Sequence, residues 1–157
     1  YDRVDNHTSL IDPKNRVTRL DRDALGRPVK VIANYIEGGP QDASSNVGTQ
    51  FEYDVLGNLL RSTSVTPGGA NQVTRFEYDQ LNRLVETIDP LDGVTSYSYD
   101  PLGNLSQIVN PKSQITRYEY DSLNRLIETT DALSGTTIYD YDAIGNLLRI
   151  SNPQSQN

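Results

Sequence analysis

Apolar and polar residues alternate along short stretches of the chain, and each stretch ends at a Tyr-Asp pair. In the clearest copy, Tyr118 and Tyr120 fall on one face of an extended segment, while Arg117 and Glu119 fall on the other. Alternation with a period of two is typical of a half-buried β-strand. A second alternating stretch begins a few residues after Asp121. The pattern therefore predicts two strands joined by a tight turn, which is a β-hairpin.

The same hairpin pattern occurs seven times, and its shared core is Tyr-Asp-x-apolar-(Gly/Asn). Successive turn aspartates are separated by 21, 31, 25, 21, 21 and 21 residues, and one degraded copy carries Arg22 in the tyrosine position. A fixed period is the signature of a repeat architecture. We therefore expect an all-β fold of antiparallel β-hairpin repeats of about 21 residues over 1–157, forming one segment of a longer repeat array.

The residue types found at the turn positions have a physical explanation. An aspartate in the first position of a type I turn accepts a backbone N–H two residues later, and Gly or Asn three residues later adopts the left-handed conformation. Together they predict a hairpin with a G1 bulge. The expected turn motif comprises Asp2, Asp23, Gly26, Asp54, Gly57, Asp79, Asn82, Asp100, Gly103, Asp121, Asn124, Asp142 and Gly145.

A second kind of turn connects consecutive hairpins, and it carries Pro in its second position in pairs such as Asp89-Pro90 and Asn110-Pro111. The fixed φ of proline suits that position. Two repeats are longer than the others, with insertions near 37–46 and 66–71, and both insertions replace a Pro-type turn. All Pro-type turns of an antiparallel meander share one edge, so we expect both loops at one rim of the sheet.

The third residue of every Tyr-Asp turn is apolar, although turn tips are usually polar. One interpretation is that each tip folds back on its own hairpin. We favour the other, in which neighbouring tips touch and form a continuous apolar spine. These residues are Val4, Leu25, Leu56, Leu81, Leu102, Leu123 and Ile144.

A meander of about fourteen strands does not stay flat, because strand twist accumulates and large open sheets curl. We expect a curled, spiralling sheet that forms part of a hollow β-shell or tube. Its first and last strands would expose unpaired backbone groups. The expected partners are therefore further repeats of the same chain, or copies of the chain paired through their strand edges.

Composition reduces the number of partner and site classes that the chain could have. The formal net charge of −7 provides no basic stripe for phosphates, so no nucleic-acid partner is expected. No apolar run is long enough to span a membrane. The chain has no Cys, which excludes disulfides and thiolate metal sites. The hydrophobic share of 35% is low for a two-layer core, and ten of the twelve aromatic residues are Tyr.

The recurring Tyr-Asp-x-Leu-(Gly/Asn)-(Asn/Arg)-Leu, followed by Asp-Pro, resembles the YD repeat of the RHS (rearrangement hotspot) family. The best matches are 53–59 and 120–126. The resemblance implies a wall segment of a hollow shell, as in bacterial polymorphic toxins, insecticidal toxin complexes and teneurins. In the bacterial members the shell encloses a C-terminal toxin, released by a self-cleaving region marked by Asp-Pro-x-Gly-Leu. That segment and any recognisable toxin domain are absent from these 157 residues.

No catalytic constellation, cofactor site or metal site emerges from the sequence. His7 is the only histidine, and we interpret it as a loop residue. Carboxylates two residues apart, Asp21/Asp23 and Asp140/Asp142, could share a calcium ion, but their turn role explains them first. Turn chemistry likewise explains Asn104 in a glycosylation sequon.

Tyrosines recur on one strand face and predict a ladder. Cross-strand packing is the favoured interpretation, and a stacking surface for sugars is the alternative. The ladder comprises Tyr53, Tyr78, Tyr97, Tyr99, Tyr118, Tyr120, Tyr139 and Tyr141. The sequence thus predicts a non-enzymatic wall segment of a secreted or surface bacterial protein, which encloses or displays a passenger. The alternative is a carbohydrate-binding or adhesive module that uses the tyrosines or the rim loops.

Overall fold

The chain forms one antiparallel β-sheet, and the all-β prediction is confirmed. The computed structural model describes residues 7–38, 47–65 and 69–152. Thirteen described strands pair strictly in chain order, so each strand neighbours the ones before and after it. The strands are β1 (His7–Ile11), β2 (Val17–Arg22), β3 (Pro28–Ala33), β4 (Val47–Tyr53), β5 (Leu59–Ser64), β6 (Gln72–Tyr78), β7 (Leu84–Ile88), β8 (Val94–Tyr99), β9 (Leu105–Val109), β10 (Ile115–Tyr120), β11 (Leu126–Thr130), β12 (Thr136–Tyr141) and β13 (Leu147–Ser151).

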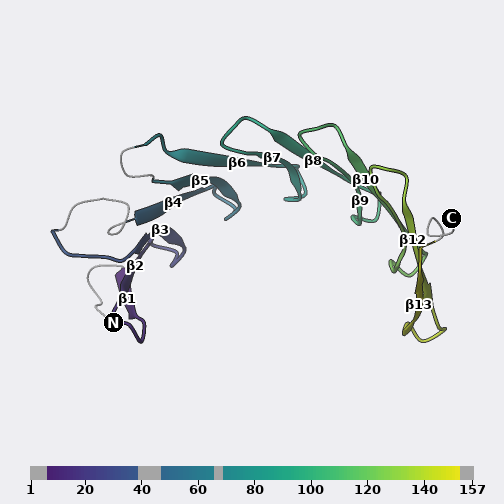
Figure 1. Ribbon diagram of the computed structural model, residues 1–157, viewed down its shortest axis with the longest axis horizontal. Coiled ribbons are helices and arrows are strands. Elements are labelled where there is room, and N and C mark those ends of the chain that lie inside the picture. The colour runs from purple at the N-terminus through teal and green to yellow at the C-terminus, as the bar shows by residue number, and fades with distance from the viewer. Residues whose placement is uncertain (1–6, 39–46, 66–68, 153–157) are drawn as a thin grey trace.

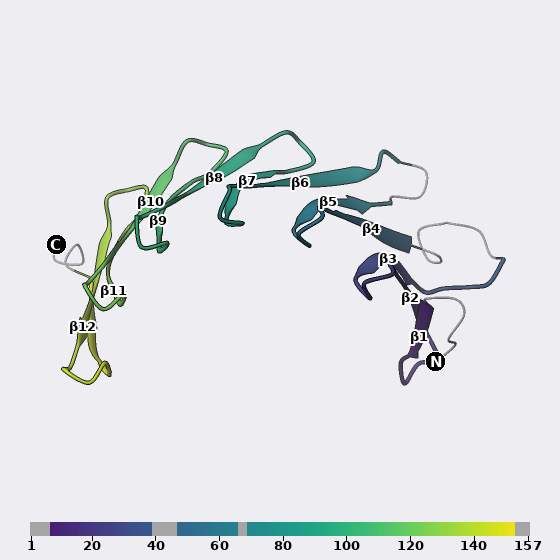
Figure 2. The same ribbon diagram turned by 180° about the vertical axis from the view of Figure 1, so that it is seen from behind.

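The sheet curves into an arch, with β1 and β13 at its two feet and β6 to β8 near its crown (Figures 1 and 2). The expectation of a curled sheet is therefore confirmed. A β-bulge in every described Tyr-Asp hairpin adds local twist to the sheet. In the hairpin of β10 and β11, Tyr120 pairs with Leu126 but Glu119 pairs with Glu128, so one residue of β11 is extra. The same shift recurs in the other five described hairpins.

The arch is a single layer, and a hydrophobic core is almost absent from it. Among the described residues, Ile32 is the one buried hydrophobic side chain, at 7% exposure. No described side chain is completely buried. Strand pairing and contacts between neighbouring hairpins must therefore supply most of the cohesion, as expected when each repeat contacts only its neighbours. None of the described residues forms a helix that is long and apolar enough to cross a membrane.

The two edges of the sheet are formed by two sets of turns. The tyrosine rim contains the described Tyr-Asp turns at 54–58, 79–83, 100–104, 121–125 and 142–146, and the equivalent turn at 23–27, which follows Arg22. The proline rim contains the turns at 12–16, 89–93, 110–114 and 131–135. Turns of the tyrosine rim bend toward the inside of the arch, whereas those of the proline rim lie on its outer side (Figures 1 and 2).

Both insertions connect strands at the proline rim, because one joins β3 to β4 and the other joins β5 to β6. Residues 39–46 and 66–68 of these insertions lie outside the described part of the chain. Asp2 and Val4, which belong to the first predicted turn, also lie outside it.

The predicted apolar spine is wrong. The apolar tips of the tyrosine rim are exposed to solvent, from Leu123 at 67% to Ile144 at 87%. Successive tips belong to hairpins two strands apart, which separates them by about 9.5 Å, too far for two leucine side chains to bury each other. Leu25, Leu56, Leu81 and Leu102 are similarly exposed.

Candidate functional site: the tyrosine rim

Each turn of the tyrosine rim is organised around its aspartate. At 121–125, Oδ1 of Asp121 accepts the backbone N–H groups of Leu123, at 2.9 Å, and Arg125, at 3.0 Å. The Nε–H of Arg125 donates to Oδ2 of Asp121 at 2.7 Å. Asn124 has a left-handed φ of 59° and donates its N–H to the Asp121 carbonyl at 3.0 Å. This is a type I turn closed by a G1 bulge.

The other described turns of this rim repeat the arrangement. Left-handed residues occupy the fourth position in all of them, namely Gly26, Gly57, Asn82, Gly103, Asn124 and Gly145. These hydrogen bonds lower the pKa of the Asp121 and Asp100 carboxyls. The backbone N–H of Arg125 is the main reason that the pKa of the Asp121 carboxyl lies below its usual value. At Asp100 the side-chain amide of Asn104 has the largest effect, and it also lowers that carboxyl's pKa.

The tyrosine before each aspartate bonds to the preceding hairpin. The hydroxyl of Tyr120 donates to the Leu105 carbonyl at 3.0 Å, and the hydroxyl of Tyr141 donates to the Leu126 carbonyl at 2.9 Å. Leu105 and Leu126 begin the β-bulges, where ladder pairing is irregular. The tyrosine hydroxyl therefore supplies a hydrogen-bond donor to the carbonyl oxygen at the start of the β-bulge. Tyr53, Tyr78 and Tyr99 form the equivalent bonds to Pro28, Leu59 and Leu84.

The residue after the left-handed position is Arg or Asn, and it reaches the next turn. The guanidinium of Arg125 lies over the Tyr141 ring, 4.9 Å from its centroid. Its Nη1 donates to the Asp142 carbonyl at 3.0 Å. Arg27 makes both contacts with the next turn, and Arg83 stacks 4.5 Å from the centroid of Tyr99. Such cation–π contacts favour a fixed spacing between turns.

Where the residue after the left-handed position is Asn, an amide–amide hydrogen bond joins its turn to the next turn. Nδ2 of Asn104 bonds both to Oδ2 of its own Asp100, at 3.0 Å, and to Oδ1 of Asn124, at 2.9 Å. Nδ2 of Asn58 reaches Oδ1 of Asn82 at 3.1 Å in the same way. The two kinds of link alternate along the rim, because Arg and Asn alternate in the fifth turn position, as Arg27, Asn58, Arg83, Asn104 and Arg125. The rim is thus joined by polar contacts instead of apolar ones, and the sequence pattern alone did not reveal these links.

The two tyrosines of each strand have different environments. Tyr97, Tyr118 and Tyr139 share a face with Tyr99, Tyr120 and Tyr141, because exposed residues alternate between them. The hydroxyl of the tyrosine next to aspartate donates a hydrogen bond to a backbone carbonyl. The rings of Tyr53, Tyr99 and Tyr141 also lie beneath an arginine guanidinium. The first tyrosine forms no hydrogen bond with any described residue.

The calcium interpretation finds no support in the turn geometry. Oxygens of Asp142 accept N–H groups of Ile144 and Asn146, and Asp21 accepts the Nε–H of Arg19. Among the described residues, no group of three or more His, Asp or Glu side chains is arranged to hold a metal ion. The interpretation of His7 as a loop residue is wrong, because His7 begins strand β1.

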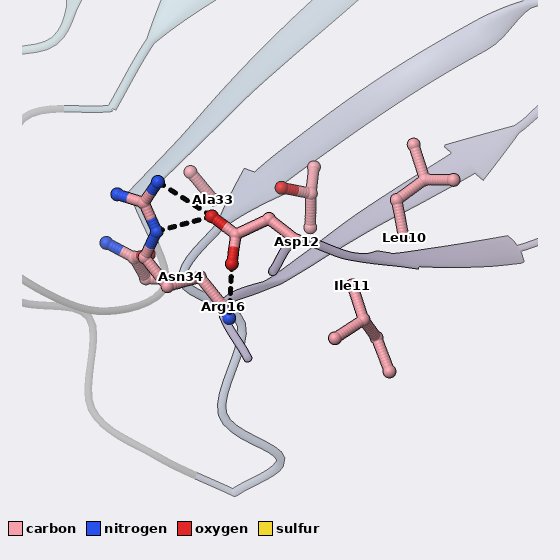
Figure 3. Close-up of a pocket in the computed structure, with 7 residues that line it drawn as sticks. Leu10, Ile11, Asp12, Arg16, Ala33 and Asn34 are labelled. Carbon is pink, nitrogen blue, oxygen red and sulfur yellow. Dashed lines mark hydrogen bonds and ion pairs between the residues drawn. The ribbon is translucent and has the colours of Figure 1, made fainter. Parts of the chain in front are cut away.

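The proline rim carries a shallow pocket between β1 and the end of β3 (Figure 3). Leu10, Ile11 and Ala33 contribute apolar atoms, and Asp12 and Arg16 form an ion pair at 2.7 Å on one side. Arg16 retains 63% side-chain exposure in this pair. The pocket lacks any cluster of catalytic groups among its described lining residues.

Comparison with known proteins identifies the repeat. The RHS Repeat family model matches residues 78–115, 99–136 and 120–156, which together span half of the chain. The chain belongs to the RHS repeat family. The predicted resemblance is therefore confirmed, and the matched part is the region of uniform 21-residue spacing. A comparison with curated proteins gave no match.

Solved structures share the fold of this RHS repeat chain. The structure titled "Crystal Structure of TcdB2-TccC3" matches with a TM-score of 0.70 and 25% identity over 95% of this chain. "Structure of Photorhabdus luminescens Tc holotoxin pore, Mutation TccC3-D651A" matches with the same TM-score and 24% identity, again over 95%. This chain spans only 9% and 8% of those two chains, respectively. The similarity includes the N-terminal part that the family model does not match.

Proposed function

We propose that this chain is a wall segment of a larger hollow assembly and has a structural, non-enzymatic role. The observation that carries the proposal is the curved single-layer sheet, in which Ile32 is the one buried hydrophobic side chain of the described residues. A layer without a core is suited to separating two spaces. Membership of the RHS repeat family and the fold shared with Tc toxin proteins support this role.

We further propose that the wall encloses or displays a passenger, such as a toxin, outside a bacterial cell. The support is the kind of protein in which the fold occurs, since the similar structures are named as a TcdB2-TccC3 protein and a Tc holotoxin pore. Closure into a shell or extension into a tube both require that the sheet continue past β1 and β13. Edges of this kind pair readily with further strands.

Sedimentation and electron microscopy of the purified chain test the proposal that it forms a wall segment. We expect self-associated species with curved or tubular outlines, formed by pairing of strand edges. Leu148→Lys places a charge on β13 and should reduce this association. Leu123→Lys is the matched control, because Leu148 and Leu123 are both 67% exposed but Leu123 lies at a turn tip. A single compact species at the chain mass of 17.5 kDa would contradict the proposal.

Carbohydrate binding is a second candidate, supported by Tyr97, Tyr118 and Tyr139. These rings are half-buried on one face and form no hydrogen bond with described residues. Aromatic rings with free hydroxyls can stack on sugars and bond to them. A glycan screen should then give a signal that Tyr118→Ala weakens and that the exposed-tip variant Leu123→Ala leaves unchanged. Absence of any glycan signal would dismiss this candidate.

A further inference from the structure

Two arginines are directly opposite each other in the interior of the sheet, Arg61 on β5 and Arg75 on β6. Directly opposite residues of an antiparallel pair share one face, with Cβ atoms about 4.5–5.5 Å apart, and like charges in these positions are destabilising. No other two basic residues are directly opposite in the described strands. This pair of positive charges therefore needs a counter-charge.

The carboxylates that reach these arginines hold them weakly. Nη1 of Arg61 lies 3.5 Å from Oε1 of Glu52, and Nη1 of Arg75 lies 3.4 Å from Oδ1 of Asp92. The side chains of Glu52 and Asp92 are 61% and 85% exposed, so water competes for both contacts. Three arginines of the tyrosine rim, by comparison, pair with their own turn aspartates at 2.7 Å. The charges of Arg61 and Arg75 are thus only loosely compensated.

Arg61 also has an unsatisfied donor. Its Nε atom is buried and forms no hydrogen bond with any described residue, and it is the one side-chain nitrogen or oxygen of the described residues in this condition. A buried donor without a partner costs free energy and calls for an explanation such as a bound ligand. The rest of the side chain stays partly exposed, as does that of Arg75. Rotation of Arg61 therefore brings its Nε and Nη donors within reach of a ligand from solvent.

The equivalent hairpin two repeats later shows that the strand pattern does not require two arginines. Arg117 occupies the position of Arg75, within the same Thr-Arg-aromatic-Glu-Tyr-Asp stretch. The residue directly opposite Arg117 on β9 is Gln107. One arginine is therefore part of the repeat, whereas Arg61 is an addition specific to β5.

We propose that Arg61 and Arg75 form a binding site for a doubly charged tetrahedral oxyanion, a phosphate or sulfate group. Planar guanidinium forks present paired N–H donors that match the oxygens of such a group, and a dianion neutralises both arginines at once. Thr63 lies two residues from Arg61 on the same face, and its hydroxyl is a third donor for the anion. One pair of arginines binds one oxyanion and is no stripe for a nucleic-acid backbone.

Two carboxylates limit the affinity of this site. Glu52 is directly opposite Arg61 on its other side, and Glu77 lies two residues from Arg75 on the same face. Both repel an anion, and Glu52 also competes for Arg61. We therefore expect a dissociation constant on the order of 1 mM, which two charge-assisted hydrogen bonds provide. The site goes beyond the proposed wall function and does not depend on it.

Equilibrium dialysis of the full chain against radiolabelled sulfate or phosphate tests the proposal, because it counts bound anions whatever the assembly state of the chain. At neutral pH and constant ionic strength in sodium chloride, we expect saturable binding of one anion per chain. Arg61→Gln, which copies the pair of Gln107 and Arg117, should weaken binding roughly tenfold or more. Arg75→Gln should do the same, and Glu52→Gln should tighten binding. Arg117→Gln is the matched control and should leave binding unchanged.

Gln107→Arg provides the converse test, because it places a second arginine opposite Arg117. This variant should raise the capacity from one anion per chain to two. Saturable binding of either anion supports the site. The proposal would be overturned if neither anion bound saturably, if Arg61→Gln and Arg75→Gln bound as tightly as the parent, or if Gln107→Arg left the capacity unchanged.

Discussion

The turn at 121–125 on the tyrosine rim and the turn at 110–114 on the proline rim share one pattern of hydrogen bonds. In each, Oδ1 of the first residue accepts the N–H groups of the third and fifth residues. The fourth residue is left-handed in both, with φ of 59° at Asn124 and 60° at Ser113. The local backbone chemistry of the two rims is therefore the same.

The rims differ in the contacts that each turn makes with its neighbours. On the tyrosine rim, the tyrosine hydroxyl and the fifth residue reach neighbouring hairpins, and a bulge follows the turn. On the proline rim, no hydrogen bond among the described residues joins the turn at 89–93 to that at 110–114, or the latter to that at 131–135. We conclude that the aspartate shapes each turn, whereas tyrosine, arginine and asparagine hold the repeats in register. This explains why both insertions fall at the proline rim.

The largest difference is expected from an insertion in one rim or the other. Gly-Ser inserted between Leu123 and Asn124 disrupts the turn and its links to both neighbours. The same insertion between Lys112 and Ser113 disrupts a turn that has no hydrogen-bonded link to the next one. The first should lower the free energy of unfolding by about 1–3 kcal/mol more than the second, as two lost hydrogen bonds predict. Denaturant unfolding measures this, and equal losses would remove the distinction between the rims.

Gly145→Val tests the left-handed position. The φ of Gly145 is 92°, and a Cβ there would meet no atom within 4 Å, so the penalty is conformational and not a clash. We expect a loss of about 1–2 kcal/mol in the free energy of unfolding. An unfolding midpoint equal to that of the parent would show that the turn does not need this conformation.

Arg125→Lys retains the charge but loses the planar group that stacks on Tyr141 and bonds to two turns. A loss of about 0.5–1.5 kcal/mol in the free energy of unfolding is expected. Arg149→Lys on exposed β13 is the control and should be neutral. Similar losses in both variants would mean that the link between turns does not contribute to stability.

Ser113→Gly should stabilise the proline rim slightly. Ser113 is left-handed, a conformation that glycine adopts without a steric penalty, although glycine also gains freedom in the unfolded chain. The net gain in the free energy of unfolding is expected to be up to about 0.5 kcal/mol, measured by thermal unfolding. A loss would indicate that the Ser113 side chain makes a stabilising contact.

Local features were predictable from the sequence, and contacts between repeats were not. Five consecutive residues determine the aspartate turn. The spacing of these turns along the sequence therefore predicts hairpins and a curled sheet. The Asn104–Asn124 bond joins residues 20 positions apart in neighbouring hairpins, and nothing in a single hairpin specifies it. The proline of Asn110-Pro111 suggested a different kind of turn, whereas both rims share Asp or Asn followed three residues later by a left-handed residue.

The central claim is that the tyrosine next to aspartate holds neighbouring hairpins together. The triple variant Tyr99→Phe, Tyr120→Phe and Tyr141→Phe removes three hydroxyl–carbonyl bonds. Tyr97→Phe, Tyr118→Phe and Tyr139→Phe remove the same atoms from the same strands and face. Denaturant unfolding should show a loss of about 2–4 kcal/mol for the first triple and under about 0.5 kcal/mol for the second. Equal losses would contradict the claim.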